Sequence, residues 1–293
     1  MSDTASADLP EGVSIGHHTD AAGQTGCTAV LTPGGAVAGV DVRGAAPGTF
    51  GTDALRAGTV IETGHAVLLT GGSIFGLAAA GGVLNYLEER GVGSAFGSIS
   101  IPGVSAAVIF DLLAGDPKAR PDAAAGYAAC AAATRAPAIG AVGAGTGATV
   151  SKGGDGSQAR RGGVGIASAT VGDATVAAVV VANSVGAIWD DEHGEWVTPP
   201  VAWDRASALI PGTNTTIGVV VTDAALSKEQ ANRLATVAHD GFARAVRPAH
   251  TMYDGDTIFC LATAVRTAPY DAVEVLAADV VAQAIALGVR AAQ

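Results

Sequence analysis

Positive charge is scarce in this 293-residue sequence. It has 16 Lys and Arg against 27 Asp and Glu, so its formal net charge is −11 at pH 7. Nucleic acids and anionic membrane surfaces are bound through cationic faces, so the charge balance argues against both as partners. A small organic substrate is the more natural ligand.

Aromatic residues are also few, at 4% of the sequence, although hydrophobic residues reach 49% and glycines number 41. A core without large rings has to be built from closely packed Ala, Val, Leu and Ile. The length allows one large domain or two, since typical domains hold about 100–200 residues. No internal repeat divides the chain.

The three cysteines, Cys27, Cys130 and Cys260, lie far apart and show neither Cys-x-x-Cys nor metal-ligand spacing. We interpret them as buried, reduced thiols, which indicates a reducing compartment. Residues 1–10 lack a basic segment followed by an apolar run, and no stretch approaches ~20 uninterrupted apolar residues. We therefore expect a cytoplasmic protein without a bound metal.

The apolar pattern predicts several strands interleaved with a few long helices, which indicates layered sheet and helix in an α/β or α+β fold. Buried strands are expected over residues 27–32, 36–42, 66–70, 106–112, 174–181, 217–221 and 257–265. Helices are expected over residues 73–89, 122–135, 227–246 and 271–289.

Local signals mark several boundaries of these elements. Pro33-Gly34-Gly35 predicts a turn between the first two strands, and Ser73 is expected to cap the first helix. Ser227-Lys228-Glu229-Gln230 reads as a capping box for the third helix. Residues 189–214 form the longest segment without periodicity, and such a loop is a plausible processing site.

Two stretches match common motifs but lack the neighbouring strand or helix that those motifs require. Gly12-Val13-Ser14-Ile15-Gly16 matches the nucleophile elbow of hydrolases but has no strand before it and no helix after it. The sequence Gly143-x-Gly145-x-x-Ala148 fits a loose dinucleotide fingerprint, but the following residues are too glycine-rich to continue as the helix that binds the phosphates. A nicotinamide-dependent enzyme is therefore a remote alternative.

Gly212-Thr213-Asn214-Thr215-Thr216 is a hydroxyl-rich turn that leads into the β-branched strand 217–221. If the Asn214–Thr215 peptide bond were cut, Thr215 would carry both a hydroxyl and a free α-amine. An amine that titrates near ~8 can take the hydroxyl proton at neutral pH, so no separate histidine is needed. The alternative is an ordinary turn that opens a buried strand.

Three charged residues fit the same chemistry. Lys152 is a lone cation in a glycine-rich frame, either a solvated charge or an active-site cation that lowers the pKa of a catalytic amine. Asp254 and Asp256 make a poor metal site because no ligand partners lie near them in sequence. They suit the binding of an ammonium group better, and an Asx-turn is the alternative.

Together these residues resemble the L-aminopeptidase/D-esterase (DmpA-like) family, which also holds β-peptidyl aminopeptidases and the endo-type 6-aminohexanoate-oligomer hydrolase of nylon degradation. The resemblance spans most of the chain. It rests, in order, on Gly16-His17-His18-Thr19-Asp20, Thr25-Gly26-Cys27-Thr28, Leu69-Thr70-Gly71-Gly72-Ser73-x-Phe75-Gly76-Leu77, Gly143-Ala144-Gly145-Thr146-Gly147-Ala148, Asn214-Thr215-Thr216 and His250-Thr251-Met252-Tyr253-Asp254-Gly255-Asp256-Thr257.

The resemblance implies an N-terminal-nucleophile hydrolase that cuts itself between Asn214 and Thr215. Its single globular domain, residues 1–293, would become a larger subunit, 1–214, and a smaller subunit, 215–293. The implied fold is a four-layered αββα sandwich. The implied assembly is a homo-oligomer of cleaved protomers, with no cofactor.

The resemblance also implies a role for each site residue. Thr215 would be the nucleophile and, through its α-amine, the base. The side-chain amide of Asn183 would stabilise the oxyanion, and Lys152 would lie near the nucleophile. Asp254 and Asp256 would position the amine and the polar groups around it.

The substrate class is less sharply implied. The Asn214–Thr215 junction resembles the threonine-using members of the family, among them the nylon-oligomer branch. That branch has a tyrosine where Phe110 stands in this sequence, so a peptidase acting at free amino termini is the first expectation and an oligoamide hydrolase the second. A non-catalytic binding protein that keeps this fold uncut is the alternative from another class.

Overall fold

The structure, a computed structural model, describes residues 7–201, 210 and 212–293. Its longer strands are β1 (Ser14–Asp20), β2 (Thr25–Val42), β4 (Thr63–Thr70), β7 (Val104–Val108), β10 (Gly163–Val171), β11 (Ala174–Ala182), β14 (Ile217–Ala224) and β16 (Thr257–Arg266). Its shorter strands are β3 (Thr49–Phe50), β5 (Ser94–Phe96), β6 (Ile99–Ile101), β8 (Thr149–Val150), β9 (Arg160–Arg161), β12 (Ala187–Asp190), β13 (Glu195–Trp196) and β15 (Val246–Arg247). The helices are α1 (Ala79–Glu88), α2 (Ala123–Ala131), α3 (Lys228–Ala245) and α4 (Tyr270–Ala292), with 3-10 turns η1 (Asp53–Leu55), η2 (Ser73–Ala78) and η3 (Gly143–Gly145).

Strand β2 links the two halves of the main sheet, whose order is β10-β11-β14-β16-β2-β4-β7-β3, with β1 paired to β2. Its first half pairs with β1 and β4, and its second half pairs with β16. The register with β4 shifts between Leu31 and Ala36. The predicted turn at Pro33-Gly34-Gly35 is wrong: the chain bulges there and continues as one strand, because a bulge tolerates the missing proline N–H and the φ of +84° at Gly35.

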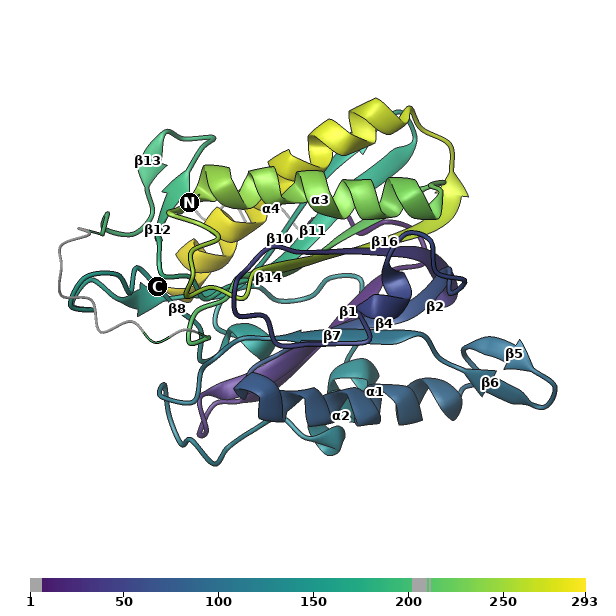
Figure 1. The fold of residues 1–293 in the computed structure, drawn as a ribbon, viewed down its shortest axis with the longest axis horizontal. Helices are drawn as coiled ribbons and strands as arrows, with labels where there is room; N and C mark the ends of the chain where they lie inside the picture. The colour runs from purple at the N-terminus through teal and green to yellow at the C-terminus, as the bar shows by residue number, and fades with distance from the viewer. Residues whose placement is uncertain (1–6, 202–209, 211) are drawn as a thin grey trace.

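The elements form four layers, αββα, as the resemblance implied (Figure 1). Helices α3 and α4 cover the half-sheet β10-β11-β14-β16, and helices α1 and α2 cover the opposite half-sheet, which contains β4 and β7. Three buried apolar clusters fill the three spaces between the layers.

Alternating residues of the central strands feed two of these cores, as the period of a strand requires. In β14, Val219 and Val221 join the cluster between the two half-sheets, whereas Val220 joins the cluster under α3 and α4. In β16, Phe259 faces the inter-sheet core and Cys260 faces the helices. The uninterrupted apolar runs in the sequence therefore reflect strands buried on both faces.

The four predicted helices are confirmed, but α1 begins later than expected and α2 ends at Ala131, four residues before the predicted end. The capping box at Ser227 and Gln230 is present and opens α3. Ser73 does not cap a helix: it has φ +53°, begins the 3-10 turn η2, and the α-helix starts only at Ala79. The three cysteines are buried and unpaired, as expected.

Helix α4 is long and apolar enough to cross a membrane by composition, but 61% of its most apolar window is buried inside the protein. Its buried residues Val280, Val281 and Ile285 belong to the core shared with α3 and the adjacent half-sheet. The apolar character of α4 is therefore accounted for by packing in the core.

Two adjacent glycines of α1 provide a matched test of close packing. A Cβ at Gly82 would lie 1.8 Å from the Ala123 carbonyl oxygen of α2, whereas a Cβ at Gly81 would meet nothing within 4 Å. Gly82→Ala should lower the free energy of unfolding by roughly 1–3 kcal/mol, because backbone has to move. Gly81→Ala should raise it by about 0.5–1 kcal/mol through helix propensity. Urea unfolding of both variants checks the prediction, and equal shifts would contradict it.

Candidate active site

The pairing of β11 with β14 brings Asn183 and Thr215 together. These strands are antiparallel, with Val181 opposite Ile217, so the residues just after β11 meet those just before β14. The Thr215 backbone N–H donates to the Asn183 carbonyl oxygen at 3.0 Å. Thr215 is buried, with 4% of its surface exposed.

Lys152 reaches the same place from the loop after β8. Its Nζ donates to the Asn183 carbonyl oxygen at 2.9 Å, to Asn183 Oδ1 at 3.0 Å and to the Thr213 carbonyl oxygen at 3.4 Å. Burial lowers the pKa of Lys152 to about 7, although the negative charge of Asp254 opposes that shift. This lysine is therefore bound within the protein, in contrast to the solvated charge that was the alternative.

The side chain of Asn183 is fixed on both sides. Its Oδ1 accepts from Lys152 Nζ and from the Thr149 backbone N–H at 3.0 Å. Its Nδ2 donates to the Phe110 carbonyl oxygen at 3.2 Å, which occupies one of the two amide hydrogens. The second hydrogen has no protein acceptor among the hydrogen bonds of the described residues.

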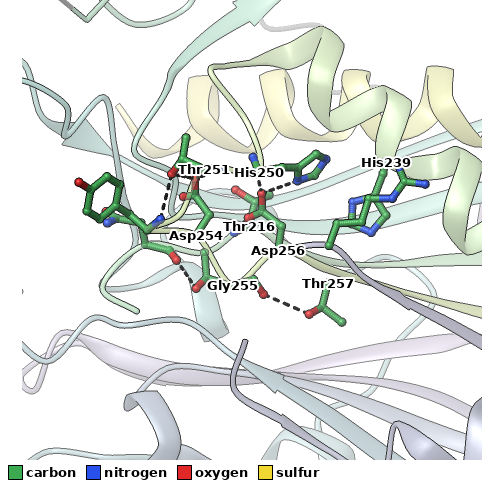
Figure 2. Close-up of polar contacts among 12 residues, drawn as sticks. Thr216, His239, His250, Thr251, Asp254, Gly255, Asp256 and Thr257 are labelled. Carbon is green, nitrogen blue, oxygen red and sulfur yellow. Dashed lines mark hydrogen bonds and ion pairs between the residues drawn. The ribbon is translucent and has the colours of Figure 1, made fainter. Parts of the chain in front are cut away.

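The Asp254-Gly255-Asp256 turn lies beside the Asn214-Thr215-Thr216 turn because β14 and β16 are parallel neighbours that start at the same edge. Asp256 Oδ1 accepts from the Thr216 backbone N–H at 2.7 Å, and its Oδ2 accepts from the His250 backbone N–H at 3.1 Å (Figure 2). Asp256 thus joins the residue after Thr215 to the loop before β16.

Asp254 has one occupied and one open oxygen. Its Oδ2 accepts from the backbone N–H and the hydroxyl of Thr251, at 2.9 and 2.5 Å, while its Oδ1 is buried and has no partner within the described part of the chain (Figure 2). Burial raises the pKa of Asp254, and the negative charge of Asp256 raises it further. Asp254 Oδ1 can therefore accept a hydrogen bond from a further group at this site.

The carbonyl oxygen of Asn214 accepts two hydrogen bonds. One comes from the Gly255 backbone N–H at 3.0 Å, and the other is a short contact from the Thr215 hydroxyl. A Cβ at Gly255 would lie 2.9 Å from Thr215 Oγ1 and 2.5 Å from the Ala46 carbonyl oxygen, so this approach requires glycine. A backbone N–H aimed at a carbonyl oxygen stabilises negative charge that develops there when a nucleophile attacks.

A cavity of about 250 Å³ opens beside this carbonyl. Its described lining comprises Phe110, Asp111, Leu113, Ala114, Gly147, Thr149, Lys152, Ile210, Thr213 and Asn214. Asp111 is already bound, with one carboxylate oxygen accepting from the Thr25 hydroxyl at 2.6 Å and the other from the Gly72 backbone N–H at 2.7 Å. Burial raises the pKa of Asp111. The cavity therefore offers apolar walls and the Lys152 ammonium next to the Asn214–Thr215 bond.

The structure thus brings together every residue expected at the site: Asn183, Lys152, Asn214, Thr215, Asp254 and Asp256. Gly255 and His250 also contribute contacts that sequence reasoning did not single out, and the Phe110 carbonyl oxygen contacts Asn183. Gly255 and His250 lie within a motif already noted, but nothing in the sequence shows that a backbone N–H of Gly255 faces Asn214. Within residues 7–201, 210 and 212–293, no group of three or more His, Cys, Asp or Glu gathers to hold a metal ion.

The two rejected motifs are elsewhere in the fold. Ser14 begins strand β1, so residues 12–16 do not form a strand-turn-helix elbow. The glycine-rich sequence from Gly143 forms the 3-10 turn η3 and then strand β8, without the helix that a dinucleotide site needs. Residues 189–201 contain β13 and the end of β12, whereas 202–209 and 211 of the expected processing loop lie outside the described residues.

Comparisons with known proteins show the family to which this chain belongs. The model of peptidase family S58 matches residues 7–293. An uncharacterised aminopeptidase of Mycobacterium leprae (strain TN) is 43% identical over 284 residues, covering 86% of this chain and 76% of the relative. A 6-aminohexanoate-oligomer endohydrolase of Kocuria sp. (strain KY2) is 35% identical over 278 residues, covering 89% of this chain and 75% of the relative.

A solved structure supports the fold independently. The L-aminopeptidase D-Ala-esterase/amidase of Ochrobactrum anthropi, described as a variant of the Ntn-hydrolase fold, superimposes with a TM-score of 0.73 at 21% identity. The match covers 99% of this chain and 88% of that chain. The sandwich is therefore of the Ntn-hydrolase type.

The lowered pKa of Lys152 predicts a signed dependence of stability on pH. Between the folded value of about 7 and the usual value of 10.5, the unfolded chain binds a proton that the folded chain lacks. The free energy of unfolding therefore rises with pH between these two values. Below about pH 7 the folded chain bears the full free-energy cost of burying a charged ammonium group. Lys152→Met removes the penalty, so its stability advantage should be largest near about pH 6 and should shrink towards about pH 9.

Urea unfolding across this pH range, with Lys152→Met compared with the parent in an otherwise identical Thr215→Ala chain, measures the difference. Lys118→Met serves as the control, since Lys118 is exposed. A stability difference that stays constant or grows with pH would contradict the prediction.

Proposed function

This chain belongs to peptidase family S58 and is a hydrolase of peptide or amide bonds, and we propose that Thr215 is its nucleophile, released by self-cleavage after Asn214. The observation that carries the proposal is the double contact at the Asn214 carbonyl oxygen. The hydroxyl that would attack and the Gly255 N–H that would stabilise the oxyanion both meet this oxygen.

In the first cleavage, Thr215 Oγ1 bonds to the Asn214 carbonyl carbon, and the hydroxyl gives up the proton that the Thr215 nitrogen takes up when it leaves. The carbonyl oxygen becomes an oxyanion held by the Gly255 N–H. When the tetrahedral centre collapses, the C–N bond breaks and the Thr215 nitrogen leaves as an amine that takes up a proton. Water then opens the resulting Asn214 ester, which yields a new carboxylate and a free Thr215 hydroxyl.

In the mature enzyme the same hydroxyl attacks the substrate carbonyl, and the α-amine of Thr215 takes its proton. The Asn183 carbonyl oxygen, which already accepts from the Thr215 nitrogen at 3.0 Å, orients that amine. The Lys152 ammonium, bonded to the same carbonyl, keeps the amine's pKa low by like-charge repulsion. The second amide hydrogen of Asn183 serves the substrate oxyanion, and Asp254 and Asp256 position the amine and its polar neighbours.

The two proposed pieces, 1–214 and 215–293, would remain in one domain. Strands β14 and β16 and helices α3 and α4 belong to the second piece, and β14 and β16 pair with β11 and β2 of the first. The buried core under α3 and α4 draws residues from both pieces. Cleavage before Thr215 therefore leaves the sandwich held by sheet pairing and apolar packing.

For the substrate we propose a small peptide or amide with a free amino terminus. The relative with the higher identity, 43%, is named an aminopeptidase, whereas the Kocuria relative at 35% is named for 6-aminohexanoate oligomers. The apolar cavity walls at Phe110, Leu113 and Ile210 keep oligoamide hydrolysis as the second candidate, since a polymethylene chain also suits them. We place the enzyme in the cytoplasm as a homo-oligomer of cleaved protomers, without nucleic acid, membrane or cofactor as partner.

Thr215→Ala should leave the chain intact at 28.5 kDa and without hydrolase activity, because neither cleavage nor acyl transfer has a nucleophile. The unmodified chain should give two polypeptides of roughly 20 and 8 kDa, the smaller beginning at Thr215. Intact mass under denaturing conditions measures both results.

Thr215→Ser is the matched control, since it keeps the hydroxyl and should still be cut. A Thr215→Ala chain that matured and hydrolysed amides would overturn the assignment. An unmodified chain that stayed whole and inactive would support the uncut binding protein instead.

Substrate preference can be tested with a free aminoacyl amide, its N-acetylated form and 6-aminohexanoate oligomers. An aminopeptidase should lose at least about tenfold in kcat/KM on acetylation, a loss of about 1.4 kcal/mol or more. Equal rates on the free and acetylated amides, with faster hydrolysis of the 6-aminohexanoate oligomers, would favour the second candidate.

A further inference from the structure

His250 is a half-buried residue next to the catalytic turn, and the reaction as described gives it no role. Its Nδ1 lies 2.8 Å from Asp256 Oδ2, and its backbone N–H donates to the same oxygen at 3.1 Å (Figure 2). The Asp256 side chain is 3% exposed. Because a carboxylate oxygen accepts hydrogen bonds, His250 Nδ1 carries the hydrogen of this contact.

Asp256 links His250 to the residue that follows the nucleophile. Its other oxygen, Oδ1, accepts from the Thr216 backbone N–H at 2.7 Å, directly after Thr215. A carboxylate is planar, so turning one oxygen turns the other. Loss of the His250 side-chain donor would leave Asp256 Oδ2 with a single donor in a buried place, where an incompletely satisfied charge is costly. The carboxylate would then rotate and loosen its hold on Thr216.

The far side of His250 is closed by His239 of α3, whose ring centroid is 4.9 Å away (Figure 2). His239 Nε2 lies 3.1 Å from the Asp41 carbonyl oxygen, so Nε2 carries the hydrogen and Nδ1 is left as a lone pair. Burial lowers the pKa of His239, and the charge of His250 lowers it further, while Asp41 and Asp256 oppose the shift. His239 is therefore neutral, and its ring packs against the His250 ring and keeps it next to Asp256.

We propose that His250 is a positioning residue for this enzyme: its imidazole orients the Asp256 carboxylate, which in turn fixes the Thr216 N–H and keeps Thr215 aligned with the carbonyl that it attacks. The inference rests on the proposed function of Thr215. It adds to that function a residue that does not contact substrate, since His250 is absent from the described lining of the cavity. The Asp256–Thr216 contact does not involve the cleaved bond, so His250 acts in both self-cleavage and turnover.

The backbone of His250 sets the choice of variants. Its φ is +55°, a left-handed conformation that favours glycine and, among other residues, asparagine. Asparagine also places an amide nitrogen near the position of Nδ1, whereas glutamine places one near Nε2. His250→Asn therefore keeps both the conformation and the donor, His250→Gly keeps only the conformation, and His250→Gln keeps side-chain volume without the donor at the right place.

The experiment follows the rate of self-cleavage of the full chain and these three variants during cell-free synthesis, by denaturing gel. His250→Asn should mature within about threefold of the unmodified chain, whereas His250→Gly and His250→Gln should mature at least about tenfold more slowly, the loss expected of a hydrogen bond to a charged group. For the matured fraction, kcat should fall in the same order while KM changes by less than about twofold.

Each variant is also made in the Thr215→Ala chain, which is expected to stay uncut, so that far-UV circular dichroism and thermal unfolding report folding separately. Equal maturation of the Gly and Asn variants would reduce His250 to a backbone requirement and overturn the proposal. Faster maturation of His250→Gln than of His250→Asn would also overturn it, because side-chain volume would then matter more than the donor. Unfolding of the uncut chain by His250→Gly or His250→Gln would overturn it as well. An unmodified chain that never matures would instead overturn the proposed function itself, and this inference with it.

Discussion

The parallel pairing of β14 with β16 is the constraint on which the site depends. Parallel neighbours begin at the same edge of a sheet, so the turns that precede them lie side by side, although about forty residues separate them in sequence. This pairing brings the Asp254-Gly255-Asp256 turn to Asn214, Thr215 and Thr216. The antiparallel partner β11 then brings Asn183 from the other side. Three strands therefore fix the backbone on both flanks of one peptide bond.

Small residues allow these segments to approach. Gly255 lets the turn meet the Thr215 hydroxyl, and Gly82 lets α1 pack directly against the start of α2. The scarcity of aromatic residues and the abundance of glycine and alanine thus have a single physical reason. Layers of a four-layered sandwich that contact through backbone leave little volume for large rings, and rigidity comes from close packing.

Much of the fold could be predicted from local patterns. The β-branched run of β11 predicted that strand, and the capping box predicted the start of α3. Predictions failed where tertiary context decides. Pro33-Gly34-Gly35 is a bulge because β2 has to serve two half-sheets, and Ser73 adopts a left-handed conformation in a 3-10 turn.

The site shows the same division. Side-chain chemistry and family resemblance pointed to Thr215, Lys152, Asn183 and the acidic pair, and the structure brings all of them together. The Gly255 N–H could not be predicted, because a backbone donor has no signature in sequence. His250 could not be distinguished from an ordinary core histidine until its distance to Asp256 was known.

The interleaving of the two halves of the chain has a consequence for the lifetime of the protein. After a cut before Thr215, β14 and β16 would still lie between β11 and β2 of the other piece. No peptide bond would join the two pieces. Once unfolded, such a protein would have to find its partner piece by diffusion, which the uncut chain never has to do. The lifetime of the mature form would then be set by its rate of unfolding, and the intact chain would be the species that folds efficiently.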